Sequence, residues 1–128
     1  MNRVEIINKV SAKAGDIDQI VGHVLSTFDQ DNTYCEVLFI DKSEIAKLNK
    51  DHRQIDKPTD VLSFPQIVVP SAKIRLLGSV VICPEVVEEK EESIEEVLKH
   101  GLLHLLSYDH ESDEAGWGEA ESKINKKC

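Results

Sequence analysis

Three histidines near the C-terminal end have the spacing of a metal site. His100 and His104 are four residues apart, so on a helix they would share one face, about one turn apart. His110 follows six residues later, far enough for the chain to leave the helix and return a third imidazole. Three neutral imidazoles with an open fourth position are typical of a catalytic zinc site, whereas structural zinc sites usually have four protein ligands. The spacing therefore predicts that His100, His104 and His110 bind one Zn²⁺.

The residue after the first histidine argues against one class of zinc enzyme. Zinc proteases share this histidine spacing, and in them a glutamate follows the first histidine as the general base. The corresponding residue here is Gly101, which cannot accept a proton from water. A metallohydrolase of another bond, such as a peptide bond, stays a less favoured alternative.

The histidines lie at the end of a segment that predicts a buried helix. Ser93 to Glu96 form a capping box, which favours a helix start there. The apolar residues that follow at helical spacing are Ile94, Val97, Leu98, Leu102, Leu105 and Leu106. Because the end of this helix is apolar nearly all round, we expect it to be central and buried.

Apolar periodicity and turn residues predict the remaining elements. Strands are expected at Arg3–Asn8, Tyr34–Ile40, Thr59–Phe64 and Leu76–Cys83, with a loop at Gln66–Arg75. Further helices are expected at Asp16–Phe28, from Asp41 or Ser43 to about Asp51, from Pro84, and at Ser112–Lys127. This order predicts an α+β fold with a small mixed β-sheet covered by helices, in a single domain spanning 1–128.

Composition narrows the class of protein. Of the 128 residues, 41% are hydrophobic and 30% charged, which excludes a membrane bundle and a disordered chain. Cys35, Cys83 and Cys128 form no CxxC pair, so we expect two buried thiols and one terminal thiol in a reducing compartment. No signal peptide or membrane span is recognisable. A cytoplasmic protein without membrane contact is therefore expected.

The net charge of −9 argues against broad binding of nucleic acid through bulk positive charge. The charge is unevenly distributed, however. Residues 85–96 and 109–121 each carry −6, which leaves the rest of the chain at +3. Residues 42–57 contain five basic and three acidic side chains. This distribution allows a local cleft that holds a few phosphates.

Two segments resemble the signatures of a known family. The run from His100 to His110, HGLLHLLSYDH, resembles the histidine motif of the YbeY endoribonucleases, which are bacterial rRNA maturation factors. Leu48-Asn49, Arg53 and the run KPTDVLSFP at 57–65 resemble the family's second motif. Leu77-Gly78 and the strand after it are similar to the next family strand. The resemblance covers about residues 35–114.

The resemblance implies a metalloprotease-like fold whose buried helix carries the zinc ligands His100, His104 and His110. It implies that Arg53 is a catalytic residue in a positive cleft beside the metal. The implied activity is cleavage of single-stranded RNA, with maturation of the 16S rRNA 3′ end and ribosome quality control. The implied partners are rRNA, the ribosomal small subunit and its proteins, and no DNA substrate is expected.

Several roles stay open at this stage. The planar donors of Arg53 match a phosphate, although an exposed salt bridge to Asp51 or Asp56 is an alternative. Asp60, Asp109 or a backbone carbonyl could orient a ligand histidine, and the general base is unassigned. His23 and His52 are expected at the surface.

Two residues depart from the family pattern. Ser79 stands where the family has aspartate, and Ser107 stands where it has glycine. Serine at position 107 is expected to strain a turn that favours positive φ. These departures leave a second alternative, a ribosome-associated assembly factor with weak or no nuclease activity.

Overall fold

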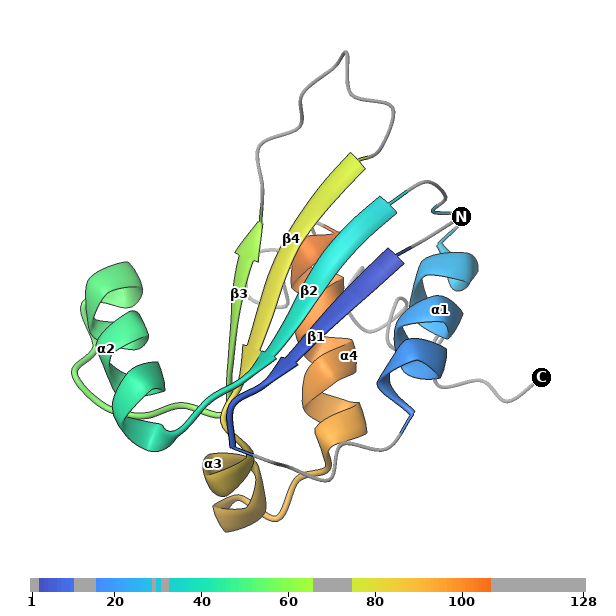
Figure 1. Cartoon of the computed structure of the whole chain (residues 1–128). Helices are drawn as coiled ribbons and strands as arrows, with labels where there is room; N and C mark the ends of the chain where they lie inside the picture. The colour runs from blue at the N-terminus through green and yellow to red at the C-terminus, as the bar shows by residue number, and fades with distance from the viewer. Residues whose placement is uncertain (1–2, 11–15, 29, 31–32, 66–74, 107–128) are drawn as a thin grey trace, which may run out of the picture.

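The computed structural model describes residues 3–10, 16–28, 30, 33–65 and 75–106. Its elements, in chain order, are β1 (Arg3–Asn8), α1 (Ile17–Thr27), β2 (Thr33–Phe39), α2 (Lys42–Arg53), β3 (Val61–Pro65), β4 (Arg75–Ile82), α3 (Pro84–Glu89) and α4 (Ile94–Leu105) (Figure 1). Each helix and strand predicted before residue 107 is present. The helix predicted at 112–127 lies outside the described residues.

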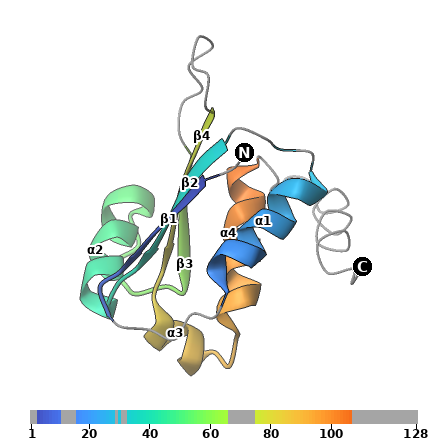
Figure 2. The same cartoon turned by 45° about the vertical axis from the view of Figure 1, so that its right-hand side comes forward.

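The four strands form the predicted small mixed sheet, in the order β1-β2-β4-β3. β1, β2 and β4 run parallel, and β3 pairs antiparallel with β4 at one edge. α1 and α4 cover one face of the sheet, whereas α2 lies on the other face (Figure 2). Several boundaries differ from the prediction by one or two residues; β3, for example, begins at Val61, and α2 continues to Arg53. The α+β fold class is confirmed.

The core lies mainly between the sheet and its two covering helices. α1 contributes four buried residues: Ile17, Val21, Val24 and Leu25. α4 begins as predicted, since the Ser93 hydroxyl accepts a hydrogen bond from the Glu96 backbone N–H at 3.1 Å. The buried side of α4 comprises Val97, Leu98, Gly101, Leu102, Leu103 and Leu105. α4 is therefore the buried central helix that its sequence predicts.

Three smaller expectations are also answered. Cys35 and Cys83 are buried thiols, and burial raises the pKa of Cys35 to about 11, whereas Cys128 lies outside the described residues. His23 is half-buried, not fully at the surface, because it lies beside the buried stripe of α1. Within the described part of the chain, no helix has the length and apolarity needed to cross a bilayer.

Gly101 allows α4 to lie unusually close to the sheet. A Cβ atom at this position would lie 2.6 Å from Val80 Cγ1 and 3.3 Å from both Ser63 Oγ and Val61 Cγ2. The Ser63 hydroxyl donates to the Gly101 carbonyl at 3.1 Å. The glycine therefore fixes the helix against β3 and β4 at the turn between the two histidines. A glutamate, as in zinc proteases, would have its Cβ inside the core.

Replacing Gly101 with alanine is expected to destabilise the protein by about 1–3 kcal/mol, because the new methyl group overpacks the contact with Val80. The matched control is Gly22→Ala in α1, where a Cβ would meet nothing within 4 Å. Alanine should stabilise that helix by about 1 kcal/mol. Urea unfolding of both variants measures the two free energies. Shifts of the same sign would contradict the packing argument.

Candidate active site

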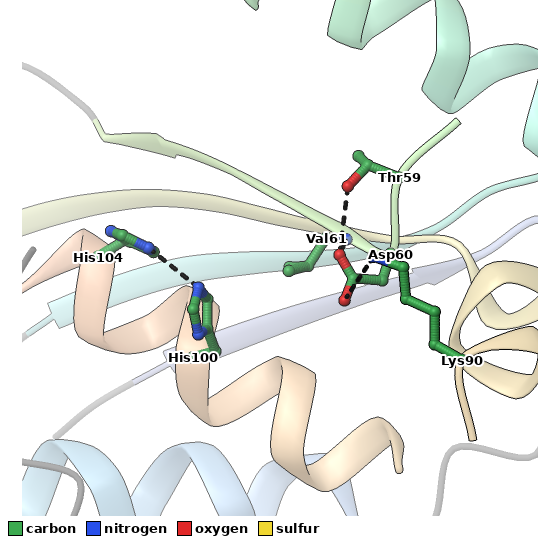
Figure 3. A network of polar contacts seen from close by, with 6 residues as sticks. All are labelled: Thr59, Asp60, Val61, Lys90, His100 and His104. Atoms are coloured by element: carbon green, nitrogen blue, oxygen red, sulfur yellow. Dashed lines mark hydrogen bonds and ion pairs between the residues drawn. The ribbon is translucent and has the colours of Figure 1, made fainter. Parts of the chain in front are cut away.

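His100 and His104 project from the same side of α4 with their rings turned toward each other (Figure 3). Their Nε2 atoms are 3.1 Å apart, and the rings meet edge to face with centroids 4.8 Å apart. Two imidazole nitrogens, each roughly 2.0–2.1 Å from a tetrahedral zinc, lie about 3.3 Å from each other. The spacing of the pair therefore suits two ligands of one metal ion.

The third predicted ligand, His110, lies outside the described residues. Within the described ranges, no three His, Cys, Asp or Glu side chains gather in a way that could hold a metal. The structure thus brings together two of the three predicted ligands. A role for His110 stays a prediction.

A cavity of about 420 Å³ opens beside the histidine pair. Its lining comes from α4, from the edge strand β3 and the residues before it, and from the end of α2. Its lining residues are His52, Arg53, Thr59, Asp60, Val61, Leu62, Ser63, Pro65, His100 and His104. Arg53 and the two histidines, far apart in sequence, therefore line one cavity.

The end of α2 positions Arg53 at this cavity. Asp41 caps the start of the helix, because its side chain accepts from the Glu44 N–H at 2.9 Å. Gln54, with a φ of 57°, caps its end. Buried Asn49 donates its side-chain amide to the Lys57 carbonyl at 2.9 Å, which ties the following loop to the helix. Cationic side chains in this last turn suit the negative end of the helix dipole.

The surroundings of Arg53 argue against the alternative that it forms a salt bridge with Asp51 or Asp56. Asp56 pairs with Lys50, at 4.0 Å, and no ion pair joins Arg53 to a carboxylate among the residues that the structure describes. Arg53 is exposed. Its guanidinium is therefore available to an anion that enters the cavity.

The Asp60 carboxylate, one of the open alternatives for orienting a ligand histidine, has its contacts with other residues. One of its oxygens accepts from the Val61 N–H at 2.9 Å and from the Thr59 hydroxyl at 3.2 Å. Its other oxygen faces the Lys90 ammonium at 3.7 Å. Figure 3 shows this carboxylate separated from the histidine pair. Of the other candidates for orientation, Asp109 lies outside the described residues.

Glu92 completes the polar group around Asp60. A hydrogen bond with Asp60 and burial raise the pKa of Glu92 to about 7. Burial opposes the ionisation of Asp60, but the hydrogen bond from Glu92 and the charge of Lys90 outweigh it and lower the Asp60 pKa. The two carboxyl groups therefore share a proton near neutral pH.

This shared proton predicts a pH-dependent stability. Because the pKa of Glu92 is raised from 4.5 to about 7 on folding, its contribution is complete below pH 4.5 and is lost as the pH rises through 7. Between pH 5 and 8, the wild type should lose stability relative to Glu92→Gln, which cannot titrate. Urea unfolding across this range measures the difference. Glu88→Gln, an exposed change on α3, is the control, and an equal profile for both variants would contradict the shared proton.

His52 is the cavity residue that sequence reasoning missed. It is exposed, as predicted, but it lines the cavity and contacts the ring of Phe64, with centroids 4.6 Å apart. The available signal is its place immediately before Arg53, which puts both side chains on the last turn of α2.

Ser79 lies away from the histidine pair. Its hydroxyl donates to Glu36 Oε1 at 3.3 Å, and it is paired in register with Glu36 and Phe64. Side chains alternate along a strand, and the next residue, Val80, faces Gly101. Ser79 therefore faces the α2 side of the sheet. Ser107, the other departure, lies outside the described residues.

Comparison with known proteins supports the family resemblance of the two motifs, at 100–110 and 48–65. The family model described as "Endoribonuclease YbeY" matches residues 4–126. An Endoribonuclease YbeY of Sulfurimonas denitrificans is 46% identical over 74% of this chain and 72% of its own length. Another, of Aquifex aeolicus, is 35% identical over 98% of this chain and 86% of its own.

A solved structure agrees with the fold. The solution structure of TM1509 from Thermotoga maritima has a TM-score of 0.54 and 25% sequence identity, and the match covers 97% of this chain and 87% of that one. Together with the motifs and the family match over nearly the whole chain, these findings show that the chain belongs to the YbeY family of endoribonucleases.

Proposed function

We propose that this YbeY-family endoribonuclease uses zinc to cleave single-stranded RNA in the cavity between α4 and the end of α2. His100, His104 and His110 would hold the metal, and Arg53 is the catalytic residue beside it. The observation that carries the proposal is the pair of Nε2 atoms 3.1 Å apart, which shares a cavity with a guanidinium that has no carboxylate partner in the described chain.

The donor set fits zinc. Imidazole nitrogens are common zinc ligands, and a three-histidine set leaves a position open for chemistry. When bound, the metal supplies a nucleophilic water at neutral pH and polarises a phosphoryl oxygen.

The chain's own residues supply binding and charge. The Arg53 guanidinium presents planar donors to two phosphate oxygens, which fixes the position of the phosphodiester. As negative charge builds on the phosphoryl group, the same donors stabilise it. Gly101 offers no base, and the Asp60 carboxylate is already engaged with Thr59, Val61 and Lys90.

The proposed substrate is rRNA, including the 3′ end of 16S rRNA, with the ribosomal small subunit and its proteins as partners. The cavity of about 420 Å³ is in the range of small-ligand sites, roughly 300–1,000 Å³, and this favours one strand over a duplex. A net charge of −9 favours reaching the RNA through a larger assembly over gripping it by bulk charge. We further propose a single hydrolase domain over 1–128 that acts in cytoplasmic ribosome maturation and quality control.

The test uses purified, metal-loaded protein with measured zinc content. Single-stranded RNA, duplex RNA, single-stranded DNA and casein are incubated with and without a chelator. We expect cleavage of single-stranded RNA alone, lost with the chelator and restored by zinc. Stoichiometric zinc without any turnover would favour an assembly factor, and cleavage of casein would favour a different metallohydrolase.

A further inference from the structure

We propose that His52, held against Phe64, is a specificity-determining residue on which one nucleobase of the RNA stacks. This inference rests on the proposed function, because it assigns a binding role within the same cavity. It adds a contact to the base where Arg53 contacts the phosphate.

The first observation is the geometry of the ring pair. The rings of His52 and Phe64 have centroids 4.6 Å apart and an interplanar angle of 54°. Phe64 is partly buried and packs against the core cluster on the α2 side of the sheet, formed by Ile40, Ile45, Leu62, Val81, Cys83 and Val86. Phe64 thus supports the imidazole from the core side.

The second observation is that the imidazole is exposed and lines the cavity. Within the described residues, this side chain interacts with the ring of Phe64 alone. An exposed ring, supported from behind and adjacent to a cavity, is the arrangement with which proteins stack bases of single-stranded RNA. Histidine is among the side chains used in this way.

The third observation is the position of His52 beside Arg53 in the last turn of α2. A phosphate held by Arg53 carries its nucleoside into the neighbourhood of the adjacent side chain. Stacking tolerates every base because each has a π-face. The pair would therefore select for an unstacked, single-stranded nucleotide without reading its sequence.

The test measures both the Kd and the cleavage of a labelled single-stranded RNA by the metal-loaded protein. His52→Ala should weaken binding about 5- to 100-fold, the usual cost of losing one base–aromatic stack, with little change in kcat. His52→Phe should restore binding, because the ring is kept. His23→Ala removes a partly buried histidine from α1, away from the cavity lining; it is the control and should bind normally.

A second arm locates the stacked base on the RNA. Each base of the RNA is replaced in turn by an abasic residue, and one position should weaken binding to the wild type but not to His52→Ala. Equal Kd values for wild type and His52→Ala, or an abasic penalty that persists in the variant, would overturn the stacking role. Wild-type binding without cleavage would instead overturn the proposed function alone. A wild type that does not bind RNA would overturn both.

Discussion

His104→Ala is expected to abolish zinc binding and RNA cleavage while the protein stays folded. The substitution removes one of two imidazoles whose Nε2 atoms lie 3.1 Å apart, and a metal held by the remaining ligands would be bound weakly. Changes in residues that only orient a zinc ligand already cost about 10- to 100-fold, so loss of a ligand should reduce cleavage by more than about 100-fold. Elemental analysis gives the zinc content, and a labelled RNA gives the rate.

The matched control is His23→Ala, which removes a histidine from α1 and should leave zinc content and cleavage unchanged. Its unfolding midpoint, compared with that of His104→Ala, shows whether either change disturbs the fold. A stoichiometric zinc content in His104→Ala would contradict the assignment of this residue as a ligand.

The same comparison tests His110, the predicted ligand beyond the described residues. If His110 completes the site, His110→Ala should match His104→Ala, and the double variant should be no worse than either alone. Residues that act as one unit show this kind of non-additivity. Full zinc and activity in His110→Ala would exclude it from the site.

Much of the fold could be predicted from local sequence pattern. The periodicity of α1 and the capping box of α4 depend on neighbouring residues, so those helices begin where the sequence predicts. The sequence predicts that α2 ends at about Asp51, whereas the helix continues to Arg53, because its end depends on longer-range contacts. Gln54 adopts a φ of 57°, and Asn49 bonds to Lys57 across the following loop, which keeps Arg53 within the helix.

The sequence predicts the part of the candidate site whose residues lie close together in one segment. His100 and His104 share a helix, so their spacing alone places them together. The cavity, in contrast, depends on the position of β3 at the sheet edge, which no local pattern gives. His52 lines the cavity and contacts Phe64 of β3, which is distant in sequence. Asp60 is engaged elsewhere because the α3–α4 turn brings Lys90 and Glu92 to it.

Arg53→Ala is expected to reduce kcat by about 100- to 1,000-fold, the usual cost of removing a donor that stabilises developing negative charge. Zinc content should stay normal, because Arg53 is on α2 and the histidines are on α4. Arg53→Lys should recover only part of the activity, since an ammonium keeps the charge but loses the planar pair of donors. Lys47→Ala removes another exposed cation from α2 and should have little effect on kcat, so it controls for the loss of charge.

The division of the effect between kcat and KM decides what Arg53 does. A fall in kcat indicates an interaction that strengthens in the transition state, whereas a higher KM with unchanged kcat indicates equal binding of the ground and transition states. In the second case Arg53 would be a binding residue, and the metal alone would stabilise the negative charge that develops on the phosphoryl group. Loss of zinc from Arg53→Ala would contradict both roles, because it would mean that the end of α2 supports the metal site itself.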